Sequence, residues 1–328
     1  MTRDAHIREV LNSQQSPVSA TAIRPEVMTE FRKHTASALS AVFAGAAFDQ
    51  VALAPVAAAV DRTGRFADNF ADRGVRSGFS SLLAIWGDPV DRAAEAEWLK
   101  MRHRDVHGRG AGHYHEIRYS ALAPDAWVWV GLSGVFVALR TFTYCTGTVL
   151  RPAEQEAAYQ MLRESFSDLE LRAESGKLPA TLADASSYYD RMLDTELRSS
   201  PFLVEQFAAL TRLPLPTIGM SAPARAALSP LWLLVRPLVG HVIQVCSSKA
   251  MVPKMQALTG FRLRPHHDLE FAVYITVLRA AWRLLPDRLL LAPLAYNRLQ
   301  YEKLVHAHRK YALDTFSVPA ERSGGCPI

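Results

Sequence analysis

The stretch DRAAEAEWLKMRHRDV, residues 91–106, decides the fold because it lacks glycine and proline and is closed by Gly108-Arg109-Gly110. It predicts a helix of about four turns with a glycine stop. One stripe of this helix, spaced i, i+3, i+7 and i+10, consists of Ala96, Leu99, His103 and Val106. His103 is therefore a lone imidazole on an apolar face. Such a histidine is either a core residue with a bonded ring N–H or a ligand, and the helix by itself leaves both open.

A second helical pattern runs through residues 62–86, just before this stretch. One of its faces mixes apolar and polar residues, namely Phe66, Phe70, Arg73, Ser77 and Ala84, and Arg76 flanks that face. Gly74 and Gly78 lie in the middle of the helix, where each glycine costs about 1 kcal/mol relative to alanine. A flat group or another backbone packed on this surface would explain the glycines. The alternative is a loosened helix with two solvated arginines.

Five short motifs follow one another between residues 73 and 130. They are Arg73-x-x-Arg76-Ser77, Gly87-Asp88, His103-x-x-Val106-x-Gly108, Tyr119-x-Ala121-x-x-Pro124 and Trp127-Val128-Trp129-Val130. In this order and spacing they resemble the MpaB/rubber-oxygenase catalytic domain family, which includes latex clearing protein and the fungal oxygenase of the mycophenolic acid pathway. The likeness covers residues 62–201 well. The rest of the chain shares only a helical texture punctuated by arginine and proline.

The resemblance implies an all-α fold, a single multi-helix domain that encloses a b-type haem, with His103 as the proximal iron ligand. The catalytic residues that it places on the other side, where dioxygen binds, are Arg73, Arg76 and Ser77. Arg73 and Lys100 are candidates to hold a haem propionate, because a buried charge needs a partner. Phe70 and Trp127 are expected to line the cofactor pocket.

The chain departs from the family pattern at two positions. Ser77 stands where the family usually has threonine, so a hydroxyl is kept but the methyl that fixes its rotamer is lost. Gly131 follows Trp129-Val130 where the family often has histidine. We expect Gly131 to open space beside the predicted pocket, and any role of that second histidine is in doubt here.

Other candidate iron ligands stay open at this point. His107, His113 and His115 lie at or beyond the glycine-rich loop, and we expect His113 and His115 to face water. Cysteine thiolates also bind haem iron, so Cys145 and Cys246 remain alternatives. All three cysteines are scattered along the chain, which suits a reducing cytoplasm and forms no metal-binding cluster.

Composition favours one mainly helical protein. The 328 residues are 49% hydrophobic, enough for a substantial core. Long periodic segments predict further helices at residues 153–173, 182–197, 269–285 and 294–310. Prolines in Leu213-Pro214-Leu215-Pro216, at Pro230 and at Pro237 are expected to mark helix boundaries. We divide the chain into an N-terminal helical extension (1–60), a haem-binding domain (61–315) and a flexible tail (316–328).

Several classes of protein are disfavoured. The net charge is +5, but the basic residues are dispersed among acidic ones, which argues against a nucleic-acid partner. Residues 36–60 are interrupted by Asp49-Gln50 and residues 128–139 are short, so we expect no stable membrane insertion, and the start shows no secretory signal. We therefore expect a cytoplasmic protein. Residues 229–245 are apolar enough to form core, a substrate channel wall or a patch resting on a membrane.

Two functions follow from the resemblance. The first is a haem b-dependent oxygenase that uses dioxygen on an apolar, unsaturated small molecule. The second keeps the haem fold for non-oxygenative catalysis, such as a dehydratase or peroxygenase, or for binding and sensing. A helical protein without a cofactor is the third reading, and the oligomeric state is left open.

Overall fold

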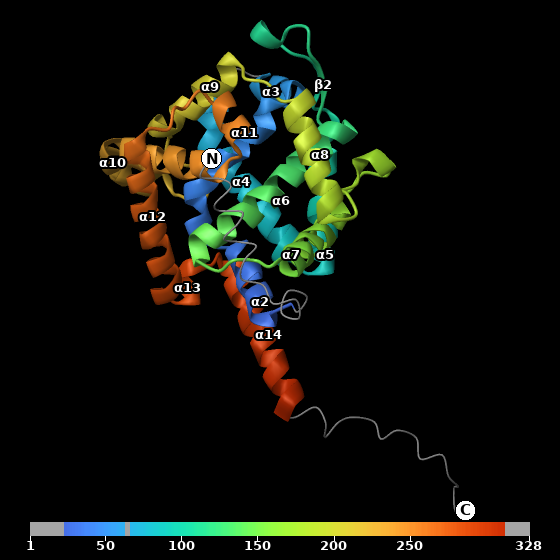
Figure 1. The fold of residues 1–328 in the computed structure, drawn as a ribbon, viewed down its shortest axis with the longest axis vertical. Helices are drawn as coiled ribbons and strands as arrows, with labels where there is room; N and C mark the ends of the chain where they lie inside the picture. Colours follow the sequence, from blue (N-terminus) through green and yellow to red (C-terminus); the bar gives the residue numbers. More distant parts are fainter. Residues whose placement is uncertain (1–22, 63–65, 312–328) are drawn as a thin grey trace, which may run out of the picture.

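The structure, a computed structural model, describes residues 23–62 and 66–311, with the backbone alone for residues 66–69. Nearly all elements of this part are helices, and Figure 1 shows them gathered around α6 (Pro124–Thr146). The helical elements before α6 are α2 (Pro25–His34), the 3-10 helix η1 (Ala38–Ala52), α3 (Ala54–Asp61), α4 (Phe66–Trp86) and α5 (Pro89–Arg104). An antiparallel hairpin joins α5 to α6, and its parts are β1 (His107–Arg109), η2 (Gly112–Tyr114) and β2 (Arg118–Ser120). The expected all-α fold is confirmed.

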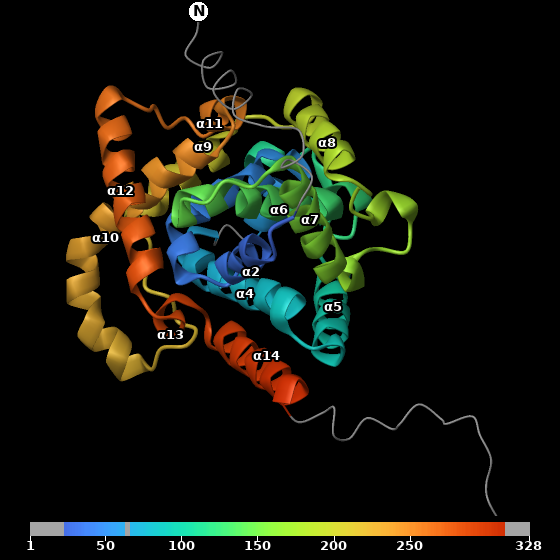
Figure 2. The same ribbon diagram turned by 60° about the horizontal axis from the view of Figure 1, so that its bottom comes forward.

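The second half of the chain consists of shorter helices and three long ones, of 29, 20 and 19 residues. In chain order these are α7 (Pro152–Ser165), η3 (Ser167–Leu169), η4 (Glu174–Gly176), α8 (Leu182–Thr195), α9 (Pro201–Ala208), η5 (Ala209–Arg212), α10 (Ala222–Ala250), α11 (Pro253–Leu258), α12 (Pro265–Leu284), α13 (Asp287–Leu290) and α14 (Pro293–Tyr311). Figures 1 and 2 both show α10 and α12 side by side, on the left of each view. The predicted tail at residues 316–328 lies outside the described residues.

Side-chain caps fix where several helices begin. The Thr181 hydroxyl accepts a hydrogen bond from the backbone N–H of Asp184 at 3.1 Å. The Ser200 hydroxyl accepts one from the backbone N–H of Leu203, also at 3.1 Å. Pro201 then occupies the first helical position of α9, where its missing N–H has no cost. The Thr181 cap explains why α8 begins at its predicted residue, and α12 and α14 also lie within a few residues of their predicted ranges. The helix predicted at 153–173 ends earlier, at Ser165.

The core lies around α6. Trp129, Leu132 and Phe142 of this helix are fully buried, and Phe31 of α2 meets Phe142 edge-on with ring centroids 5.4 Å apart. Ala57 of α3 belongs to the same apolar cluster. The helices that precede residue 62 therefore contribute to the core that surrounds α6.

The predicted helix boundaries at Pro230 and Pro237 are wrong, whereas Leu213 to Pro216 do lie in a loop. Both prolines lie inside α10, and Figure 2 shows α10 bent. Proline removes one backbone hydrogen bond and kinks a helix without having to end it. The exposure of this half of α10 lets water reach the freed carbonyl groups.

Two of the described helices are long and apolar enough to cross a membrane, by length and composition only. In α6 half of the most apolar 18-residue window is buried inside the protein, but in α10 only 6% is buried. The sequence did not reveal these lengths, because the apolar run at residues 128–139 covers only part of α6 and because Pro230 and Pro237 predict breaks within α10. Most of residues 229–239 are not core, since Leu231, Leu233, Leu234 and Leu238 are exposed.

Candidate functional site

The helix that carries His103 is held between two stops. Asp88 caps its start, because one carboxylate oxygen accepts the N–H of Val90 and of Asp91 at 3.0 and 2.9 Å. The helix ends at Arg104, slightly before the predicted end, and Gly108 follows in β1 with a φ of +150°. This backbone conformation favours glycine, so the glycine of the His103-x-x-Val106-x-Gly108 motif shapes the hairpin.

The hydrogen bond of His103 defines which ring nitrogen is free. Nδ1 lies 2.8 Å from the carbonyl oxygen of Leu99, one turn earlier in α5. A carbonyl only accepts, so Nδ1 carries a proton, and in the neutral imidazole Nε2 then keeps the lone pair. The half-buried ring also meets the edge of Trp127, with centroids 5.5 Å apart and planes at 85°. The Leu99 bond and the Trp127 contact therefore orient the ring, and Nε2 makes neither of them.

The short helix η3 connects α5 to α6 at this point. The Lys100 ammonium donates to the carbonyl of Asp168 at 2.7 Å, and Arg92 lies 3.9 Å from the Asp168 carboxylate. On the other side, the indole N–H of Trp127 donates to the Leu169 carbonyl at 2.8 Å. These bonds hold the α5 face of His103 against the start of α6. The Lys100 ammonium is thus already bonded to η3. Its role toward a haem propionate stays a prediction.

The predicted catalytic residues lie on α4. Arg73 is an exposed residue whose Nη1 donates to the Val60 carbonyl at 3.4 Å. Partial desolvation of the guanidinium, and then the like charge of Arg62, lowers the pKa of Arg73 from its ordinary value. Arg76 and Ser77 are exposed. Phe70, on the same helix, stacks on Phe48 at 5.3 Å and is half-buried.

Open space lies over several mid-helix glycines. A Cβ added to Gly74 or Gly78 of α4, or to Gly134 of α6, meets no atom within 4 Å. A Cβ at Gly131 meets only the Leu178 side chain, at 3.7 Å, so the space expected there is bounded by Leu178. Helix interiors disfavour glycine, and these glycines neither adopt a positive φ nor pack on a neighbouring backbone. A group bound against α4 would account for Gly74 and Gly78.

These features fit a haem. The Leu99 bond of His103 involves Nδ1 and not Nε2, α4 lacks a Cβ atom at Gly74 and Gly78, and Arg73 and Arg76 carry the positive charge that propionates need. The competing ligands fit less well. His113 and His115 are exposed, as expected. Burial raises the pKa of both Cys145 and Cys246 to about 12, so these cysteines remain thiols at neutral pH and make poor iron ligands.

The opposite face of α6 carries a buried polar group that the sequence did not reveal. Asp49 of η1 accepts from Trp129 through its carbonyl (3.2 Å) and from the Tyr189 hydroxyl through its carboxylate (3.5 Å). Arg140 in turn donates to the Tyr189 hydroxyl at 3.2 Å. Burial raises the pKa of Asp49 to about 7 although Arg140 opposes the shift. Only a polar interruption in an apolar run signalled Asp49 in the sequence.

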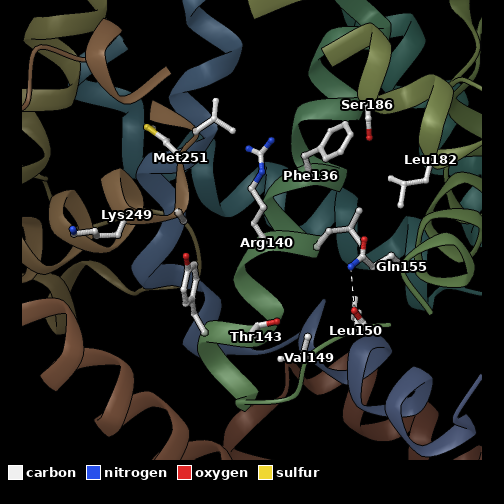
Figure 3. A pocket seen from close by; sticks show the side chains of 14 residues that line it. Phe136, Arg140, Thr143, Val149, Leu150, Gln155, Leu182, Ser186, Lys249 and Met251 are labelled. Atoms are coloured by element: carbon white, nitrogen blue, oxygen red, sulfur yellow. Dashed lines mark hydrogen bonds between the residues drawn. The ribbon is translucent and has the colours of Figure 1, made fainter. Parts of the chain in front are cut away.

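A separate cavity of about 530 Å³ lies beside the second half of α6. Figure 3 shows Arg140 pointing into it between Phe136 and Met251, and none of the predicted site residues lines it. Along α6, Arg140 is about 20 Å from Trp127, at 1.5 Å per residue. This cavity is therefore distinct from the site around His103.

Comparison with protein-family models identifies a match over most of the chain. The model described as "ER-bound oxygenase mpaB/B'/Rubber oxygenase, catalytic domain" matches residues 31–280. No curated protein and no solved structure matches the chain. The matched span contains every predicted site residue and extends the likeness beyond residues 62–201 in both directions. The chain therefore belongs to the MpaB/rubber-oxygenase catalytic domain family.

Proposed function

We propose that this protein is a haem b-dependent oxygenase that acts on an apolar, unsaturated small molecule, with His103 as the iron ligand. The observation that carries the proposal is the hydrogen bond from Nδ1–H of His103 to the Leu99 carbonyl, which leaves Nε2 free. Membership of an oxygenase family supports the reaction class. Bound haem would supply an iron centre able to react with dioxygen.

His103 has two supports that suit a metal ligand. The Leu99 carbonyl accepts the Nδ1 proton, which fixes the tautomer and makes Nε2 a better electron donor. Trp127 restrains the plane of the ring and is itself held by η3. The imidazole therefore loses little conformational freedom when it binds iron.

The residues of α4 would complete the site. Arg73 and Arg76 offer positive charge to the haem propionates or to the dioxygen side, and the Ser77 hydroxyl offers a hydrogen bond there. Phe70 and Trp127 present apolar surface, which excludes water and suits an apolar substrate. We expect Arg73→Ala to weaken haem retention if its partner is a propionate.

A spectrum of the purified protein tests the cofactor. Protein produced with adequate haem should show a Soret band, and His103→Ala should lose haem or shift the band sharply. His107→Ala is the matched control, because His107 is an exposed histidine of the adjoining hairpin. If His103→Ala keeps the parent's haem content and spectrum, His103 is not the ligand.

Labelled dioxygen tests the reaction. The product of an oxygenase should carry the label, and none should form without dioxygen. Turnover that continues without dioxygen or peroxide would point to a dehydratase or isomerase, and ligand binding without any turnover would point to a sensor. Either result contradicts the oxygenase proposal. Haem binding is tested separately, by the absorption spectrum.

A further inference from the structure

Three metal-ligating side chains meet between α10 and α12, away from the site around His103. His241 comes from α10, and His267 and Glu270 come from α12, one turn apart. Each offers a ligand atom, and these atoms all lie within 4.8 Å of one another. Nε2 of His241 and a carboxylate oxygen of Glu270 lie 2.8 Å apart. The proposed haem function uses none of these residues.

From this cluster we infer a second metal site, which binds one divalent transition-metal ion, Zn²⁺ in the first instance. Two imidazoles and one carboxylate are ligands that zinc accepts, and three protein ligands leave a position for water. With bonds of about 2.1 Å, two ligands of a tetrahedral or octahedral site lie about 3.0–3.4 Å apart. The His241–Glu270 pair needs only a small outward movement to accept the ion.

The surroundings restrain the ligands and leave the ion a path of entry. His267 is buried, and its ring stacks on Phe261 with centroids 5.4 Å apart and planes at 26°. About a third of each of the His241 and Glu270 side chains is exposed, so an ion and its water ligand can reach them. Restraint of a ligand before binding lowers the entropic cost of binding.

One hydrogen bond has to change when the ion binds. The backbone N–H of Arg264 donates to Nδ1 of His267 at 2.9 Å, so in this arrangement Nε2 carries the ring proton. If the metal binds Nε2, that proton moves to Nδ1, and the N–H of Arg264 must turn to water. Arg264 is exposed, so water is available to it. The amide signal of Arg264 is therefore a local reporter of metal binding.

Equilibrium dialysis of the full chain against Zn²⁺, with elemental analysis of the protein, tests the site. Glu270→Gln keeps an acceptor for His241 but removes the charge, and His267→Asn keeps an acceptor for the Arg264 N–H but removes the second ring nitrogen. Both should preserve the helix contacts in the absence of metal. We expect each to weaken zinc binding about tenfold or more, whereas His306→Ala, which removes an exposed histidine of α14, should have no effect.

The outcomes separate a metal site from a purely structural cluster. Zinc that binds the parent with a stoichiometry of one, shifts the Arg264 amide and is lost in both variants supports the inference. Equal zinc binding by the parent and both variants overturns it, and so does a parent that binds no zinc. Thermal unfolding of the metal-free variants checks that their fold is intact. Because the zinc measurement does not depend on haem, failure here leaves the proposed oxygenase function untouched.

Discussion

Gly78 offers a sharp test of where the cofactor binds. It lies in the middle of α4, and an added Cβ meets nothing within 4 Å. Gly78→Ala should therefore stabilise the haem-free chain by about 1 kcal/mol, the difference in helix propensity between glycine and alanine. If haem packs on this face, the same methyl overfills the occupied site. Overpacking typically costs about 1–3 kcal/mol, so haem affinity should fall by roughly 5- to 150-fold.

The two effects have opposite signs, which makes them easy to distinguish. Urea unfolding of the haem-free chain measures the first, and the rate of haem transfer to an acceptor globin measures the second. Gly78→Leu should abolish haem retention, while Ala94→Leu adds similar bulk to the far side of α5 and should not. A Gly78→Leu variant that holds haem as tightly as the parent would refute the placement of haem against α4.

Three further predictions follow from the charges and burial of single residues. Arg76→Ala and Ser77→Ala should retain haem but change the affinity for carbon monoxide or cyanide, measured by titration; unchanged affinities would mean that α4 does not face the iron. Because burial raises the pKa of Asp49 to about 7, ionisation penalises the folded state, and stability should fall by roughly 3 kcal/mol as pH rises from 4 to 7. Chemical unfolding of Asp49→Asn should lack this decline, and a parallel decline in the variant would contradict the assignment. Burial lowers the pKa of His34 to about 4, so protonation of the unfolded chain should cost roughly 3 kcal/mol of stability as pH falls from 6.5 to 4, and His34→Gln should flatten that window in the same assay.

The helices of this chain were predictable because their signals are local. Periodicity and capping residues placed α4, α5, α8, α12 and α14 to within a few residues. The prediction failed at α10, where two prolines indicate helix ends but the folded helix continues through them. Pro230 and Pro237 are breakers by their chemistry, but a bent helix with one exposed side tolerates them.

The candidate site was predictable only in part. Helix phase alone put His103 inward and grouped Arg73 with Ser77, since both statements need only the 3.6-residue period. The same phase placed Lys100 near the site but could not reveal that the Asp168 carbonyl binds its ammonium. Partners 68 residues apart in the chain are fixed by the packing of helices, which no local pattern encodes.

The sequence by itself determined the helical class, the family resemblance and the isolation of His103 on its helix. The Leu99 bond that selects the tautomer of this histidine is also local, because both residues lie in α5. Only the tertiary structure decided the orientation of the ring, because Trp127 comes from another helix. Tertiary structure likewise buried Asp49 and His34 and joined His241 to His267 and Glu270. Desolvation and ligand geometry depend on what surrounds a side chain in space, and a helix period fixes only the direction in which that side chain leaves its own backbone.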